Sequence, residues 1–221
     1  IFLTLEIPKE RVYLNETYLV TIKLYIDRLG VRDIQMPQWT QDGFSVASFE
    51  QPRQYQEVVN GINYHVVEFS TTAFGLRPGE FRLGPISLQC NLLAQRRPRR
   101  SPSPTFDDLF NVGAIQDLLG GGYQVYTVSL RSKDIPLTVM ALPEENRPVD
   151  FSGALGVFDL DVSVDPREVK VGDPVTLRAL VRGQGNLSSV DVPKADLGDA
   201  FKVYEPQVKQ DKQTKIFEQV L

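Results

Sequence analysis

The stretch VFDLDVSVD at residues 157–165 decides the fold class of this chain. After its first residue, apolar side chains occupy the even positions, and aspartate or serine occupies the odd ones. Successive side chains of a β-strand point to opposite faces of a sheet, so this pattern predicts a strand with one buried and one solvated face. The same alternation recurs at residues 17–26, 62–69, 123–130, 135–141 and 174–181. Many short strands separated by turn residues predict an all-β sandwich or barrel.

The composition favours the same fold class and excludes several others. Valines outnumber alanines by 25 to 9, and β-branched residues prefer strands to helices. A hydrophobic content of 42% and a net charge of -4 are typical of a soluble globular protein. The composition therefore excludes a helical bundle and a coiled coil. The slightly acidic balance also argues against a basic nucleic-acid-binding protein.

An internal repeat divides the chain into two parts. The segment IPKERVYLNET at residues 7–17 aligns with VDPREVKVGDP at residues 164–174, at a spacing of 157 residues (164 minus 7). Two shorter pairs follow at almost the same spacing: residues 34–37 with 190–193, and residues 43–46 with 200–203. Two copies of one plan predict two tandem immunoglobulin-like β-sandwich domains, at residues 1–142 and 143–221.

The second copy is shorter than the first. The first continues through residues 62–74, 80–83 and 86–94, whereas the second stops at residues 216–221. We therefore expect the second sandwich to lack its last strands and the natural chain to continue. A free sheet edge is a template for pairing with another chain, so an edge-strand dimer of the fragment is also expected.

A long arm at residues 96–122 interrupts the first copy, between two strands that we expect to pair as a hairpin. Loops longer than about 12–15 residues are functional or disordered. The arm combines a basic cluster with apolar residues at helical spacing, and these are the candidate partner-binding residues: Arg96, Arg97, Arg99, Arg100, Phe106, Leu109, Phe110, Ile115, Leu118 and Leu119. One interpretation is that the apolar stripe docks in the groove of a partner. The others are that it folds back onto its own sandwich, or that the arm is disordered.

No catalytic pair can be assembled from this sequence. His65 is the only histidine and Cys90 the only cysteine. Alternation places Cys90 on the inward face of its strand and His65 on an outward face, whereas a nucleophile and its base must lie within hydrogen-bond reach. We therefore interpret Cys90 as an inert core residue. One cysteine and one histidine also cannot complete a closed zinc site.

Two other patterns favour structural interpretations over binding sites. The segment GQGNLS at residues 183–188 begins like a dinucleotide-binding motif, but it lacks the third glycine and leads into a strand and a proline. We interpret it as a tight turn whose glycines allow positive φ. Asp159, Asp161 and Asp165 lie on one strand face, where carboxylates diverge instead of converging on Ca²⁺. We therefore expect no enzyme activity, no cofactor and no metal.

Several motifs in the second half resemble the BatD family of aerotolerance ("oxygen tolerance") proteins. They are PVDFSGALGVF at 148–158, Asp165-Pro166, VKVGDPVTL at 169–177, GQGNL at 183–187 and VYEP at 203–206. The resemblance implies a bacterial envelope protein on the periplasmic side, anchored in the inner membrane by a segment absent from this chain. It also implies neighbours with von Willebrand factor A-type domains, a link to aerotolerance or stress resistance, and no catalytic residues.

These observations predict a non-enzymatic module that binds and assembles protein partners in the envelope, with no nucleic-acid partner. Two alternatives stay open. One is a strand-capturing module like a chaperone or an adhesin, which adds a strand at a sheet edge. The other is an enzyme acting on cell-envelope polymers, for which the sequence offers no paired acid and base.

Overall fold

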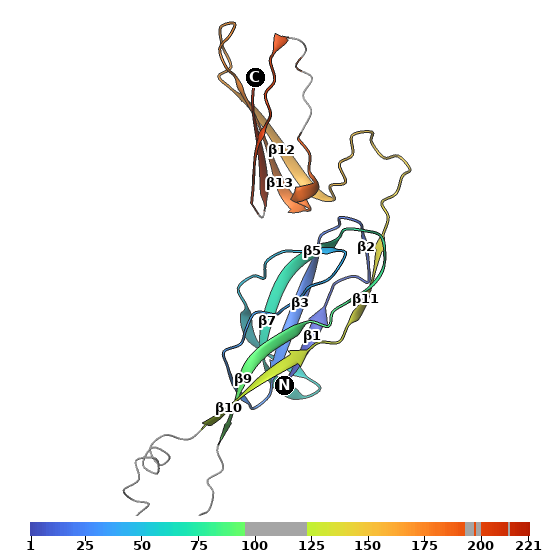
Figure 1. The fold of residues 1–221 in the computed structure, drawn as a ribbon, viewed down its shortest axis with the longest axis vertical. Helices are drawn as coiled ribbons and strands as arrows, with labels where there is room; N and C mark the ends of the chain where they lie inside the picture. The colour runs from blue at the N-terminus through green and yellow to red at the C-terminus, as the bar shows by residue number, and fades with distance from the viewer. Residues whose placement is uncertain (96–122, 193–196, 198–199, 212) are drawn as a thin grey trace, which may run out of the picture.

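The computed structural model describes residues 1–95, 123–192, 197, 200–211 and 213–221 (Figure 1). Its regular elements are fifteen β-strands and one short 3₁₀ helix, and no α-helix occurs within these residues. The predicted all-β class is therefore confirmed. The strands form a larger group from residues 1–142 and a smaller sheet from residues 156–220, which lie end to end in Figure 1.

The N-terminal strands form a β-sandwich-like arrangement of three sheets. The first sheet has the order β1 (Phe2–Glu6), β3 (Tyr18–Ile26) and β7 (Ile62–Gly75), with β5 (Phe44–Val46) and β6 (Arg53–Val59) along β7. The second has the order β10 (Tyr123–Arg131), β9 (Ser87–Gln95) and β4 (Gly30–Arg32). The third has the order β2 (Arg11–Tyr13), β11 (Ile135–Met140) and β8 (Gly79–Leu83). Strands β9 and β10 pair antiparallel, as expected for the strands that flank the arm.

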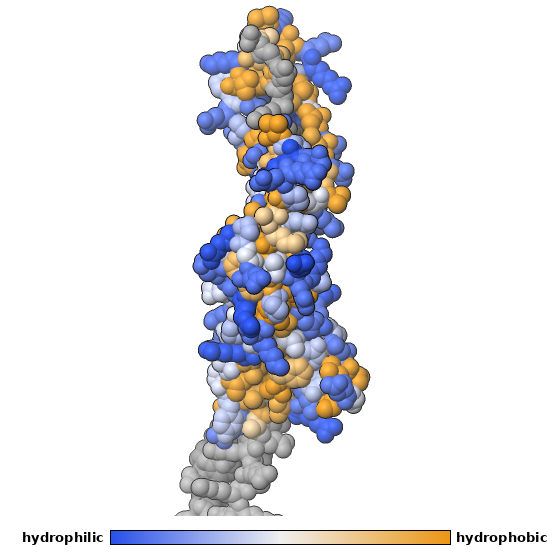
Figure 2. All heavy atoms as spheres, turned by 90° about the vertical axis from the view of Figure 1, so that its right-hand side faces the viewer, coloured by the Kyte–Doolittle hydropathy of each residue, from blue (hydrophilic) through white to orange (hydrophobic). Residues whose placement is uncertain are grey.

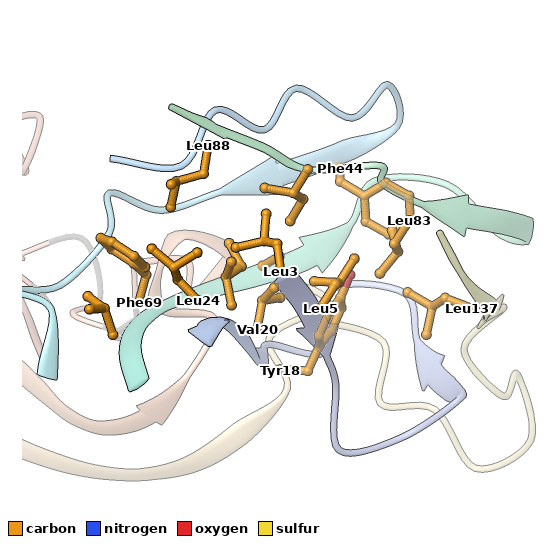
Figure 3. Packing of buried hydrophobic residues seen from close by; sticks show 14 of the residues in the cluster. Leu3, Leu5, Tyr18, Val20, Leu24, Phe44, Phe69, Leu83, Leu88 and Leu137 are labelled. Atoms are coloured by element: carbon orange, nitrogen blue, oxygen red, sulfur yellow. The ribbon is translucent and has the colours of Figure 1, made fainter. Parts of the chain in front are cut away.

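The core lies between the first sheet and the other two. Inward residues of β3, such as Val20, Ile22 and Leu24, are completely buried, because alternation directs them all to one face. They pack against Leu83, Leu88 and Leu137 and others of the opposite strands (Figure 3). Cys90 belongs to this core and is 1% exposed, and burial raises the pKa of its thiol. Its predicted core position is confirmed, while His65 is exposed on β7.

The C-terminal strands form one antiparallel sheet. Its order is β12 (Gly156–Asp165), β13 (Thr176–Gly185), β15 (Thr214–Val220) and β14 (Gln207–Gln210). A 3₁₀ helix, η2 (Leu187–Ser189), lies against one end of the sheet. A second, smaller hydrophobic cluster forms there from Ala179, Val181, Leu187 and Phe217, with Phe158, Val190 and Val192 packed against it.

The repeat in the sequence is also a repeat of backbone structure. Strand β1 pairs with β3 so that Leu3 faces Leu24, and β12 pairs with β13 so that Leu160 faces Val181. Both members of the second pair are 157 positions beyond those of the first (160 minus 3, and 181 minus 24). The sheet order β12–β13–β15–β14 therefore reproduces the order β1–β3–β7–β6. The two segments share one plan down to strand register.

Candidate functional site at the junction cleft

An open cleft lies where the N-terminal strands meet the C-terminal sheet. Its volume is about 1230 Å³, and both groups of strands line it. We call it the junction cleft. The residues that matter below are Lys9, Arg11, Tyr13, Glu16 and Leu19 on the N-terminal side, and Val157, Gly183, Gly185, Asn186 and Asp211 on the C-terminal side.

A tight turn between β2 and β3 builds the N-terminal wall. The Glu16 amide donates to the Tyr13 carbonyl at 3.0 Å, and Glu16 Oε2 accepts from the Tyr13 amide at 2.8 Å. Lys9 Nζ donates to Glu16 Oε1 at 2.7 Å. Asn15 has a φ of 64°, which the turn requires, and its Nδ2 donates to the Gly153 carbonyl at 3.5 Å. The turn thus contacts the connecting segment as well as the cleft.

Glu16 carries the electrostatic part of this turn. Burial raises the pKa of its carboxyl, but the hydrogen bonds from Lys9 and the Tyr13 amide, with the Lys9 charge, lower it by more. The pKa in the folded protein is therefore below its ordinary value. A carboxyl of this kind stabilises the fold above the unfolded pKa, and that contribution is lost as the pH falls through the folded pKa.

We expect the Glu16→Gln substitution to lower the free energy of unfolding at pH 7 by about 1 kcal/mol or less. The effect is small because Lys9 is largely exposed and solvent screens the ion pair. At pH 3 the difference should be smaller than at pH 7, since the contribution of the carboxylate is lost as the pH falls towards and through its folded pKa. Urea unfolding at both pH values measures this, with the exposed neighbour variant Glu10→Gln as the control. A deficit of equal size at both pH values would contradict the assignment.

Close backbone contact between β12 and β13 builds the C-terminal wall. Gly183 and Gly185 have φ values of 154° and 147°, so the predicted positive φ is confirmed. The predicted tight turn is wrong, because both glycines lie within the last three residues of β13 and pair with β12. A Cβ at Gly185 would lie 2.9 Å from Cζ of Phe158. The glycines are therefore needed for the close approach of Phe158 and of the β12 backbone.

Asn186 follows these glycines and is 3% exposed. Its amide donates to the Leu155 carbonyl at 3.1 Å, which ties β13 to the connecting segment. Its Nδ2 has no hydrogen-bond acceptor among the residues that the structure describes. Buried polar groups in proteins almost always have partners, so this donor is an exception, and the atom itself is enclosed by the protein.

The cleft is lined by both charged and apolar side chains. Glu16 and Asp211 lie on opposite walls; Lys9 pairs with Glu16, and Arg11 lines the same wall. Neither His65 nor Cys90 lines the cleft. In the part of the chain that the structure describes, no three His, Cys, Asp or Glu residues are grouped to hold a metal ion. Apolar side chains complete the lining, with Leu19 at 49% and Val157 at 80% exposed.

The residues predicted from the sequence to bind a partner do not form part of this site. All ten, from Arg96 to Leu119, lie outside the described residues, so their role stays a prediction. Of the three aspartates on β12, Asp161 lies 3.6 Å from Arg182, and all three are exposed, as in a solvated strand face. Sequence reasoning missed the junction cleft. The glycines at 183 and 185 were its available signal, because they mark close backbone approach.

Within the described ranges, no helix is long and apolar enough to cross a membrane. The chain matches no model of a protein family, no curated protein sequence and no solved structure.

Proposed function

We propose that this chain is a non-enzymatic module that binds an extended segment of a protein partner in the junction cleft. The observation that carries the proposal is the cleft itself, which is open, measures about 1230 Å³ and is lined from two groups of strands. Sites for small molecules usually have about 300–1000 Å³ and enclose most of the ligand. A larger and open cleft of mixed polarity is better suited to a polypeptide.

The lining offers the contacts that such a segment needs. Leu19 and Val157 present apolar surface from opposite walls, and Arg11 adds an exposed positive charge. Interfaces combine apolar anchors with a few polar groups in this way.

The resemblance to BatD proteins supports the biological part of the proposal. On the basis of this resemblance, we propose that the protein acts on the periplasmic side of a bacterial envelope, as an assembly factor in aerotolerance or stress resistance. It points to proteins with von Willebrand factor A-type domains as partners. The finer fold assignment, two tandem immunoglobulin-like domains with a boundary near residue 142, belongs to the same proposal. The two separate hydrophobic clusters and the repeated strand register support it.

The Leu19→Asp variant should bind the neighbouring von Willebrand factor A-type protein at least about tenfold more weakly, because it puts a charge on an apolar anchor. Leu29→Asp is the matched control, since Leu29 is similarly exposed at 44% but does not line the cleft. Biolayer interferometry with the purified partner measures both affinities. Equal binding by wild type and the Leu19 variant would count against the cleft as the site.

The strand-capturing alternative keeps one observation in its favour. Strand β12 has ten residues and, among the strands that the structure describes, it pairs only with β13, so its other edge has no described partner. Hydrogen exchange on the same complex separates the two functions. Slower exchange along β12 on partner binding, together with unchanged affinity of the Leu19 variant, would assign strand capture in place of cleft binding.

A further inference from the structure

A second concave surface lies at the opposite end of strand β3 from the junction cleft. Its volume is about 470 Å³, and its lining comes from the end of β3, from β6 and from the turn and first residues of β7. We call it the hairpin pocket, because β6 and β7 form a hairpin beside it. Phe2 pairs with Tyr25 near this end of β3, so the pocket is at the end marked N in Figure 1, away from the C-terminal sheet. The face drawn in Figure 2 shows hydrophobic and hydrophilic residues side by side at this end.

Strand register brings polar side chains together in the hairpin pocket. Ile26 of β3 lies opposite His65 of β7, and His65 lies opposite Gln56 of β6. Residues directly opposite one another in antiparallel strands have their side chains on the same face of the sheet. Asn63 lies two positions before His65, so it is on this face as well, and its Nδ2 donates to Gln56 Oε1 at 3.2 Å. An imidazole and two amides therefore lie beside one apolar side chain.

This face is the inward face of the first sheet. Ile26 is 7% exposed and belongs to the N-terminal core, as does Val67, two positions after His65. The predicted outward position of His65 is therefore wrong, although its side chain is exposed because it lies beyond the edge of the core. Among the described residues, its imidazole has no hydrogen bond or ion pair. A polar group on the core's own face thus lines the pocket without a partner.

Arg28 supplies the positive charge of the pocket at a cost in backbone strain. Its φ is 47°, in the left-handed region that is unfavourable for residues with a long side chain. At the corresponding position of the second copy, 157 residues later, the chain has Gly185. Strained residues of this kind cluster at ligand sites, where the side chain is needed. An arginine where the repeat has a glycine is therefore evidence that the guanidinium has a role.

Most of the Arg28 guanidinium is available to a ligand. Its one ion pair among the described residues is with its neighbour, where Nε lies 3.6 Å from Asp27 Oδ1. The Arg28 side chain is 91% exposed, so this pair is loose. A guanidinium presents five N–H donors in a planar fork, and the contact with Asp27 is made at Nε. The terminal N–H groups are left to bind two oxygens of one carboxylate.

We propose that the hairpin pocket binds the carboxylate of a small organic molecule. Arg28 binds the two carboxylate oxygens, and His65 donates a further hydrogen bond. Ile62, which is 42% exposed, contacts the apolar part of the ligand. Because the lining holds one arginine and one aspartate, it suits a single negative charge better than the higher charge of phosphate. The inference goes beyond the proposed function, since the hairpin pocket and the junction cleft share no residue.

Titration of the purified chain with benzoate, followed by ¹H–¹⁵N nuclear magnetic resonance at pH 7, tests the site. Benzoate should shift the amides of residues 27–28 and 61–65, with a dissociation constant of about 1–10 mM because the pocket is open to solvent. Arg28→Gln should weaken binding at least about tenfold. Arg32→Gln is the matched control, because Arg32 also pairs with a neighbouring aspartate, at 3.5 Å, but does not line the pocket. The spectra also show whether each variant is folded. Equal benzoate affinity of wild type and a folded Arg28→Gln variant would overturn the proposal.

Two further probes test the class of ligand. Benzamide has the same ring without the negative charge, and it should bind at least about tenfold more weakly than benzoate. Inorganic phosphate at the same ionic strength should also bind more weakly than benzoate, because of Asp27. Equal binding of benzamide and benzoate would overturn carboxylate recognition in favour of a merely apolar surface. Tighter binding of phosphate would assign a phosphate site instead, and unshifted pocket amides with all three probes would show that there is no site.

Discussion

The Gly183→Ala variant should lose the C-terminal sheet while keeping the N-terminal strands folded. A Cβ at this position would lie 2.1 Å from the Val157 carbonyl oxygen and 2.9 Å from Phe158 Cα, both of them backbone atoms. The φ of 154° adds strain for any residue with a side chain. Because β13 pairs with both β12 and β15, separating β12 there disrupts the middle of the sheet. We expect a cost of at least about 3 kcal/mol in the free energy of unfolding.

The single tryptophan makes this measurable in one experiment. Trp39 packs against the N-terminal core, so its fluorescence during urea unfolding reports that part alone. Far-ultraviolet circular dichroism reports both parts, and only this signal should show an early loss in the variant. Gly172→Ala is the control, since Gly172 has a φ of 97° but nothing within 4 Å of its added Cβ. Similar losses in the two alanine variants would mean that strain alone, and not the close approach, explains Gly183.

The Lys215→Ala variant should destabilise the same sheet by about 2–4 kcal/mol. Lys215 is 8% exposed and lies opposite Val181 of β13. In the first sheet, Val67 lies opposite Leu24 at the corresponding position. Its ammonium replaces an apolar side chain in the core. Burial lowers the pKa of Lys215, and the nearby Asp191 opposes this shift.

Three backbone carbonyls explain why a lysine is tolerated there. Lys215 Nζ donates to Val190 at 2.6 Å, to Leu187 at 3.1 Å and to Ser188 at 3.4 Å. These groups belong to η2 and the residue after it, and carbonyls at the end of a helix favour a cation. The Leu187 carbonyl also accepts from the Val190 amide at 3.1 Å. Alanine removes both the donors and the packing, whereas Lys215→Met keeps most of the packing.

The methionine variant therefore separates the two contributions, and it should lose about half as much free energy of unfolding as the alanine variant. Lys209→Ala is the control, because Lys209 is exposed and pairs with Glu218 on the solvated face; we expect a change of about 0.5 kcal/mol or less. Urea unfolding followed by circular dichroism measures all three variants. If Lys215→Met were as stable as the wild type, the hydrogen bonds from the ammonium to the three carbonyls would contribute nothing to the stability of the sheet.

Local pattern was enough to predict the strands whose two faces differ in polarity. Residues 158–165 alternate strictly, and β12 spans 156–165. The polar strand β6 was not predicted, because as an edge strand of the first sheet it buries little of either face. The prediction of a tight turn at residues 183–185 was wrong for a related reason. Glycine with positive φ is common to turns and to closely packed strands, and only the partner strand distinguishes them.

The sequence by itself determined the all-β class, the inward position of Cys90 and the 157-residue repeat, because each depends on alternation and spacing along the chain. The tertiary structure alone decided where the junction cleft and the hairpin pocket lie and why Lys215 is buried. These features depend on contacts between residues far apart in the sequence, such as Lys215 with Val190 or Asn15 with Gly153. Alternation shows which way a side chain points, but it does not show what the side chain meets there.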